Sequence, residues 1–327
     1  MNNSESTRKL IDDLGSANPL ARYRAVDALT MRRNTTFAAI NALLTQGTPL
    51  QRVGAAEILG RWRDPKTLPT LSAGMKDSDA SVRARCVEAL GLMNDTRALD
   101  ALLAATRDTH PEVRAWAVDV LGRWKQKVAR DILRDALQDR DPNVRWHAVE
   151  GLARGGGKRA LAQLIPLLAD RDAGVRALVA ELLGHARIAA AQEPLVELLN
   201  DDDYAVRWRA ADALVALGNA RVIPVISARL KNVDAGVRWR AAYILGGLQA
   251  KRAVPALIAT LDDSDAHVRG RVAEALGAIG EPRALDALRA HANDEASAGH
   301  LGSVGEVAQA AITLIEKRAP RTRRKKA

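Results

Sequence analysis

Nine arginines recur through the sequence at an almost constant spacing, and this repeat limits the possible folds more than any other feature. The first interval is one position shorter than the seven that follow, which are all equal, and a leucine stands seven positions after each arginine. The arginines are Arg22, Arg52, Arg83, Arg114, Arg145, Arg176, Arg207, Arg238 and Arg269. A unit copied at a fixed period of this length indicates a repeat architecture, in which each copy is one small supersecondary element.

Each arginine lies near the start of a predicted amphipathic helix, which we call the B helix. In the stretch from Asp141 to Ala153, the apolar residues Val144, Ala148 and Leu152 fall on one helical face. An aspartate precedes the helix, where its carboxylate can accept hydrogen bonds from the first free backbone N–H groups. This cap position is occupied by Asp79, Asp141, Asp172, Asp203, Asp234 and Asp265.

A second helix follows the B helix in each unit, as in the stretch from Arg252 to Leu261. One antiparallel pair of this size cannot bury the apolar stripes of both helices, so successive pairs must stack into a continuous core. We therefore predict an all-α fold, an α-solenoid in the form of a right-handed superhelix. It should contain about ten helical-hairpin repeats with a 31-residue period and a concave face lined by the B helices.

The register of the repeat breaks near the C-terminus. We expect one solenoid over residues 1–316, with a divergent N-terminal repeat and regular repeats over about 18–292. A glycine-rich insertion at 296–305 and a capping helix at 304–317 follow, because terminal repeats meet water on their outer side. The insertion suggests a capping loop, with a binding loop as the alternative. Residues 318–327 form a basic tail that we expect to be disordered.

The repeat resembles a known family. The pattern Asp-x-x-Val-Arg-x-x-Ala-x-x-Ala-Leu-Gly, with the Arg-Ala-Leu-x-x-Leu segments at Arg97–Leu102 and Arg283–Leu288, is similar to the HEAT-like repeats of phycobilin lyases. The resemblance covers roughly residues 18–292. It implies the solenoid fold, and it extends to bilin lyase subunits, bacterial scaffold proteins and, more distantly, deoxyhypusine hydroxylase. The last of these holds iron with His-Glu pairs, and none of the six histidines here is followed by Glu.

The formal net charge of +10 is concentrated in the tail. The last eleven residues carry seven Lys and Arg, so subtracting seven from ten leaves about +3 for the body. The segment 317–327 could make weak contacts with nucleic acid or another anionic partner, or it could only improve solubility. The body itself is not a basic domain.

The arginine column can form a structural ladder. The arginines lie four residues after each cap, where their guanidinium groups could pair with an aspartate of the same or the next repeat. We expect the ladder to join Arg83, Arg114, Arg145, Arg176, Arg207, Arg238 and Arg269 to the cap aspartates Asp79, Asp141, Asp172, Asp203, Asp234 and Asp265.

A second basic row should project outward two positions after the ladder. It consists of Arg24, Arg85, Arg209, Arg240 and Arg271. Three positions later an acidic residue stands in eight repeats of nine: Asp27, Glu57, Glu88, Asp119, Glu150, Glu181, Asp212 and Glu274. These i, i+3 neighbours can pair on a helix surface, and together they cancel the field that a polyanion groove would need.

Aromatic residues lie beside the arginines of several repeats. The candidate partner-binding residues are Trp116, Trp146, His147, Trp208, Arg209, Trp239 and Arg240. Aromatic and arginine side chains together are typical of binding hot spots, although rings in a solenoid also fill space between helices. We expect this face to bind a protein or peptide. We expect no enzymatic activity, no cofactor and no metal.

Two other functions stay open. The resemblance implies a possible phycobilin-lyase or chaperone role, and an Arg/Trp groove or the basic tail could bind nucleic acid. The single cysteine, Cys86, lies on an apolar helix face and cannot form a disulfide within the chain. No apolar run approaches the roughly 20 residues that span a bilayer. We expect a cytoplasmic protein without membrane contact.

Overall fold

The computed structural model describes residues 3–124 and 127–318, and the regular structure in these ranges is helical apart from one isolated β-bridge between Ser297 and Ser303. Residues 319–327, most of the predicted tail, lie outside the described residues. The chain divides into two compact units, Met1–Ala160 (unit 1) and Leu161–Ala327 (unit 2).

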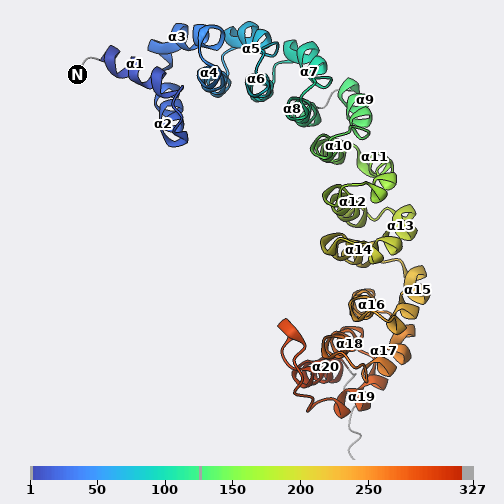
Figure 1. Cartoon of the computed structure of the whole chain (residues 1–327). Helices are drawn as coiled ribbons and strands as arrows, with labels where there is room; N and C mark the ends of the chain where they lie inside the picture. The colour runs from blue at the N-terminus through green and yellow to red at the C-terminus, as the bar shows by residue number, and fades with distance from the viewer. Residues whose placement is uncertain (1–2, 125–126, 319–327) are drawn as a thin grey trace, which may run out of the picture. The chain divides into compact units, whose positions relative to one another are not determined.

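Unit 1 consists of helix pairs. Its helices are α1 Asn3–Asp13, α2 Pro19–Thr30, α3 Arg33–Gln46, α4 Pro49–Trp62, η1 Pro65–Thr67, α5 Leu68–Gly74, α6 Ala80–Met93, η2 Thr96–Ala98, α7 Leu99–Ala105, α8 Pro111–Arg123, α9 Lys127–Ala136 and α10 Pro142–Gly155, followed at its end by α11 Gly157–Ala162. The B helices α4, α6, α8 and α10 pack side by side in one layer, and α3, α5, α7 and α9 form the other (Figure 1).

Unit 2 repeats this arrangement. Its helices are η3 Ile165–Ala169, α12 Ala173–His185, η4 Ala189–Ala191, α13 Gln192–Glu197, η5 Leu198–Asn200, α14 Tyr204–Leu217, η6 Ala220–Val222, α15 Ile223–Ala228, η7 Arg229–Lys231, α16 Ala235–Gly247, η8 Lys251–Ala253, α17 Val254–Thr260, α18 Ala266–Ile279, η9 Pro282–Ala284, α19 Leu285–Ala290, η10 Gly299–Leu301 and α20 Val304–Arg318. The B helices α12, α14, α16 and α18 stack in order, and α20 closes the stack against α18. Both units therefore have the predicted all-α solenoid architecture.

The aspartates at the start of the B helices are N-caps. Asp79, for example, accepts hydrogen bonds from the backbone N–H groups of Ser81 and Val82. The remaining cap aspartates of the sequence pattern act in the same way: Asp141, Asp172, Asp203, Asp234 and Asp265.

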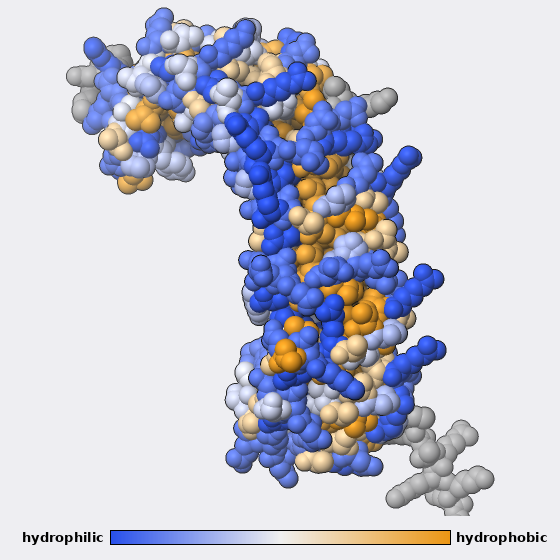
Figure 2. Space-filling model, turned by 45° about the vertical axis from the view of Figure 1, so that its right-hand side comes forward, coloured by the Kyte–Doolittle hydropathy of each residue, from blue (hydrophilic) through white to orange (hydrophobic). Residues whose placement is uncertain are grey.

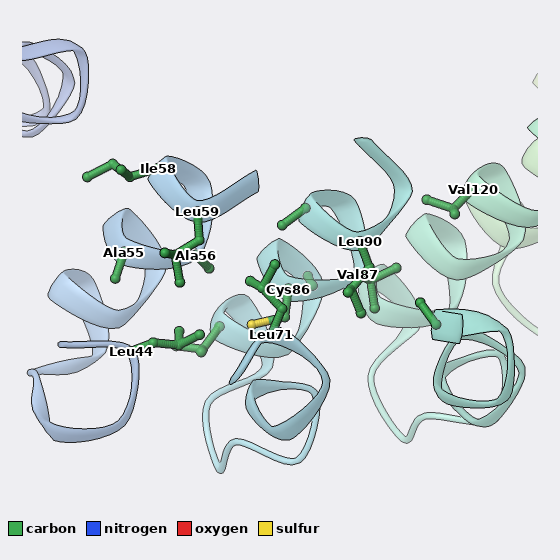
Figure 3. Packing of buried hydrophobic residues seen from close by; sticks show 14 of the residues in the cluster. Leu44, Ala55, Ala56, Ile58, Leu59, Leu71, Cys86, Val87, Leu90 and Val120 are labelled. Atoms are coloured by element: carbon green, nitrogen blue, oxygen red, sulfur yellow. The ribbon is translucent and has the colours of Figure 1, made fainter. Parts of the chain in front are cut away.

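The core lies between the two helix layers and between neighbouring B helices. In unit 1, Leu59, Leu71 and Leu90 are fully buried, and Figure 3 shows Cys86 among them, pointing toward Leu71. The B helices approach closely where glycines face small residues: a Cβ atom added to Gly122 of α8 would lie 2.8 Å from the Cα of a glycine on α10. Such close packing explains why a core with few aromatic residues is sufficient.

The arginine column forms a ladder, but its partners differ from those expected. Arg83 donates through Nε and Nη2 to both carboxylate oxygens of Asp108, at 2.8 Å each, and through Nη1 to the backbone carbonyl of Asp77 at 2.8 Å. The same carboxylate pairing, always at this interval along the chain, joins Arg52 to Asp77, Arg114 to Asp139, Arg176 to Asp201, Arg238 to Asp263 and Arg269 to Asp294.

The ladder aspartates lie two residues before the caps of the next repeat, so the prediction that the caps themselves pair with the arginines was wrong. The physical reason is that each cap carboxylate is held by its own helix, whereas the preceding aspartate faces the arginine of the previous repeat. Asp77 also accepts the backbone N–H of Asp79 at 2.9 Å. Against the raising effect of burial, the hydrogen bonds from Arg52 and from this N–H lower the pKa of Asp77.

Candidate binding site

The predicted site residues of unit 1 lie on α8 and α10. The rings of Trp146 and His147 meet edge to face, with centroids 5.3 Å apart. Trp116 and His147 line a pocket of about 310 Å³ together with Pro111, Glu112, Ala115, Asp141 and Asn143. The Nδ1 atom of His147 is buried without a hydrogen bond in the described part of the chain. Unit 1 thus brings three of the seven candidate residues together.

Unit 2 contains a larger group of rings, which we call the aromatic cluster: Tyr204, Trp208, Trp239, Tyr243, His267 and His300. The centroid of Trp208 lies 5.0 Å from that of Trp239 and 5.4 Å from that of Tyr243. Tyr204 meets Trp208 edge to face at 6.4 Å. Trp239 meets His267 at 5.5 Å, and His267 lies 5.9 Å from His300 in the loop before α20. The rings therefore form one continuous chain of contacts across α14, α16 and α18.

Three guanidinium groups border the aromatic cluster. Arg207 lies over the ring of Tyr204 at 5.6 Å, and Arg240 and Arg271 lie 5.1 Å and 5.8 Å from the centroid of Trp239. Cations at these distances from an aromatic face are electrostatically attracted to it.

The expectation that the second basic row projects outward was wrong for two of its members. Arg240 is only 4% exposed and Arg271 only 6%, and Trp239 is buried as well. Arg240 lies against Trp239 of its own helix and near Arg207 of the preceding repeat, and Arg271 lies against Trp239 of the preceding repeat. A single-helix pattern does not contain these contacts between repeats. Arg209 is exposed and pairs with Glu181 at 3.4 Å.

The acidic residues three positions after the second basic row, which we call the acidic counter-row, pair partly within helices and partly between repeats. Arg271 donates to Glu274 at 2.9 Å, as the i, i+3 spacing predicts, and Arg85 pairs with Glu88 in the same way. Asp212 instead accepts a hydrogen bond from the hydroxyl of Tyr243 at 2.7 Å, in the next repeat. Burial, followed by this hydrogen bond, raises the pKa of Tyr243 to about 12.

Arg240 differs from the other buried arginines because it has no anionic partner. Within residues 3–124 and 127–318, no hydrogen bond or ion pair involves its guanidinium group, and its Nε atom is buried and unpaired. Burial, and then the positive charge of Arg207, lower the pKa of Arg240. Arg271 is similarly buried but is paired with Glu274 and with the Nε2 atom of His300, at 2.8 Å.

At two positions this repeat lacks an acidic residue that the neighbouring repeats have, and this leaves Arg207 and Arg240 without a carboxylate partner within the described part of the chain. Arg207 donates to the backbone carbonyls of Asp201 and Asp202, but Asn232 stands at the position where the neighbouring repeats have the ladder aspartate. The Nε atom of Arg207 is accordingly buried without a partner in the described residues. Tyr243 stands three residues after Arg240, at the one position of the counter-row that is not acidic. Aligning the repeats at these two positions would have located the site from the sequence.

A cavity of about 820 Å³ also lies within unit 2, near η3, α13 and η5. It is lined by apolar residues that include Ile165 and Leu168 and by the carboxylates of Glu193 and Glu197. Arg176 reaches this cavity, but its Nε and Nη2 atoms are occupied by Asp201. The sequence pattern did not indicate this cavity.

No three His, Cys, Asp or Glu side chains among the described residues are grouped to hold a metal ion. Cys86 is fully buried, and burial raises the pKa of its thiol to about 12. In the same ranges, no helix has the length and apolar character needed to cross a membrane.

The stacked helix pairs, the capped B helices and the ladder define a helical-repeat solenoid. The family model of HEAT repeats matches residues 38–110, 100–176, 161–243 and 226–300, and the chain belongs to the HEAT-repeat family. No curated protein sequence matches the chain.

Solved structures share this fold. Importin beta is 15% identical with a TM-score of 0.66, and the match covers 97% of this chain and 54% of importin beta. Kap95p, in a structure with RanGDP, is 14% identical with a TM-score of 0.69, covering 97% of this chain and 50% of that one. The Escherichia coli protein YibA is 20% identical with a TM-score of 0.55, covering 81% and 97%. This chain therefore spans about half the length of importin beta and Kap95p.

Proposed function

We propose that the chain is a non-catalytic scaffold that engages a protein or peptide partner on the B-helix face of unit 2, at the aromatic cluster. The observation that carries this proposal is the chain of rings across three neighbouring B helices, which ends in the 57% exposed Tyr204 and includes the partly exposed Trp208. Rigid aromatic anchors beside arginine are the side chains that dominate binding energy in protein interfaces.

The surface chemistry supports a protein partner. Figure 2 brings forward the side of the molecule where Figure 1 draws α11, α13 and α15, and hydrophobic residues (orange) alternate there with hydrophilic ones (blue). Around the aromatic cluster, Arg209 and Asp212 present charges of both signs. Alternating charges with aromatic anchors fit a specific protein interface. They fit a nucleic-acid backbone less well, because neighbouring carboxylates repel phosphates.

Of the relatives, Kap95p binds RanGDP. We extend only the use of the solenoid as a protein-binding surface to this chain. The phycobilin-lyase alternative gains no support from Cys86, because a buried thiol with a raised pKa is a poor nucleophile.

Site-specific photo-crosslinking tests the proposal. A photoreactive amino acid at Tyr204 should capture a partner in cells, whereas the same group at Val225, 46% exposed on α15, is the matched control. The partner is identified by mass spectrometry and its binding is reconstituted with purified proteins.

The purified pair then gives the decisive measurement. Trp208→Ala should weaken binding by about 30-fold, which corresponds to a hot spot of about 2 kcal/mol, while Trp208→Phe should weaken it less. Equal capture from Tyr204 and Val225, or unchanged affinity of the folded Trp208→Ala protein, would disprove this site.

A further inference from the structure

We infer that the partner presents an acidic side chain, aspartate or glutamate, that pairs with Arg240, next to an apolar or aromatic residue that packs on Tyr204 and Trp208. This inference rests on the proposed function and specifies the chemistry of the partner. It is independent of the basic tail.

The first argument is the unpaired buried cation. Arg240 is only 4% exposed, and a guanidinium group buried in this way without an anion is unfavourable, because the lost hydration is not replaced. Arg271 shows that burial at the equivalent position of the next repeat is compatible with a carboxylate partner, Glu274. The missing partner of Arg240 is therefore a local departure from the pattern and not a requirement of the fold.

The second argument is that two acids of the repeat pattern are missing from one repeat. Asn232 replaces the aspartate that would pair with Arg207, and Tyr243 replaces the acid that would follow Arg240. Arg207 acts electrostatically on Arg240, so two guanidinium groups contribute to one positive region. A carboxylate supplied by another molecule would compensate this charge.

The third argument is the position of the guanidinium group at the start of α16. A Cβ atom on Gly236, in the first turn of this 13-residue helix, would lie 3.4 Å from Nη1 and 3.5 Å from Nη2 of Arg240. The positive end of the helix dipole thus adds to the charge of Arg240. Asp234, which caps α16, acts electrostatically on Arg240 without forming an ion pair within the described residues.

The surroundings favour one carboxylate over a polyanion. Asp202, Asp203, Asp212 and Asp234 lie on or beside the helices of the aromatic cluster and would repel a ligand with many phosphates. A single planar carboxylate matches the planar donor face of one guanidinium group. Tyr204, more than half exposed, supplies the apolar surface for the neighbouring residue.

Selection from a displayed library of random peptides tests the inference with the full-length protein as the target. Peptides that bind are synthesised with acetylated and amidated ends, so that only side chains carry charge. Each is compared with a version in which Glu or Asp is replaced by Gln or Asn. A labelled single-stranded oligonucleotide and inorganic phosphate serve as the alternative anions.

The expected result is enrichment of peptides with an acidic residue beside an aromatic or large apolar one. Replacing that acid, or Arg240→Gln in the protein, should weaken binding about tenfold or more, because a charge-assisted hydrogen bond is lost. Arg221→Gln, which removes the same charge from an exposed site on η6, should change the affinity less than about twofold. Arg240→Gln removes the cation–π contact with Trp239, but it also removes a buried charge that has no ion pair in the described residues, so Tm should change little.

The other outcomes separate the two proposals. If peptides bind in a Trp208-dependent way but without an acid, or tolerate Arg240→Gln, the inference is wrong and the binding scaffold stands. If no selected peptide depends on Trp208, both proposals fail at this site. If the oligonucleotide or phosphate binds in an Arg240-dependent way while acidic peptides do not, the carboxylate assignment is overturned.

Discussion

Restoring the missing ladder carboxylate should stabilise the protein. In Asn232→Asp, the new side chain would stand where Asp201 and Asp263 stand in the neighbouring repeats, at the same interval after the ladder arginine. Asn232 already accepts the backbone N–H of Asp234 at 2.9 Å, as the ladder aspartates do with their own caps. A carboxamide presents one oxygen and one donor NH₂, so it cannot form the two parallel N–H···O bonds that a carboxylate accepts from a guanidinium group, and it carries no negative charge.

The size of the effect follows from the equivalent pair. Arg176 and Asp201 form two N–H···O contacts of 2.8 Å, and their side chains are 16% and 8% exposed. Exposed pairs contribute about 0–1 kcal/mol and hydrogen bonds to charged groups about 1.5–3 kcal/mol. For this partly buried pair we expect about 1–2 kcal/mol, intermediate between those ranges. In a domain of this size that corresponds to a rise in Tm of about 2–8 °C.

The assay is thermal and urea unfolding followed by circular dichroism, with Asp263→Asn as the matched opposite change. Asp263→Asn should destabilise the protein by a similar amount, because it removes the partner of Arg238. Repeat proteins can unfold in parts, so calorimetry should test whether one transition is observed.

The refuting result is specific. If Asp263→Asn lowers Tm as expected and Asn232→Asp leaves it unchanged or lower, Arg207 is not oriented for a ladder pair. The assignment of the positive region to a missing carboxylate would then lose half of its support. Unfolding at low pH adds a further check, because the rise in Tm caused by Asn232→Asp should disappear once the new carboxyl group is protonated.

Three further predictions concern the scaffold itself. Gly122→Ala should destabilise unit 1 by about 1–3 kcal/mol through overpacking, measured by urea unfolding, whereas Gly155→Ala, with open space around its Cβ position, should not. Despite burial, pairing with Arg52 lowers the pKa of Asp77 from 3.8, so the charged pair should stabilise the protein at every pH above that value. Tm should therefore be nearly constant from about pH 7 to 5 and fall as the pH drops below about 4. Cys86 should react with a thiol reagent only at the rate of unfolding, and labelling within seconds in the native protein would contradict its burial.

The fold was predictable because several sequence signals for the same helix recur along the chain. The cap at Asp141, the apolar face that contains Val144 and the leucine seven positions after the arginine all indicate the same B helix. The leucine recurs in all nine repeats, and the other two signals recur in most of them. Local preference and hydrophobic pattern agree, which is the condition for a confident prediction of structure. The choice between two aspartates as ladder partners was not predictable in the same way, because Asp77 and Asp79 are two residues apart and only the geometry of the turn assigns one to the cap and the other to Arg52.

The candidate site was only partly predictable, because it depends on contacts between repeats. Trp208 and Trp239 were identified from composition and position, and they do contact each other. Arg240 was expected on the outer surface, since the helix pattern alone does not show contacts with neighbouring repeats. Tyr243 was not considered at all, although it packs on Trp208 and occupies the acid position next to Arg240.

The positions that depart from the repeat are therefore the informative ones. A residue that recurs through most of the repeats is explained by the solenoid, because the fold uses it there; Arg238 and Asp263 are of this kind. Asn232 and Tyr243 are not, since the neighbouring repeats show that acids are compatible with the same backbone positions. Both departures remove negative charge from the repeat that contains the buried Arg240. Since surface residues of a repeat scaffold can change without loss of the fold, two coincident changes that leave a cation unpaired are better explained by binding than by stability.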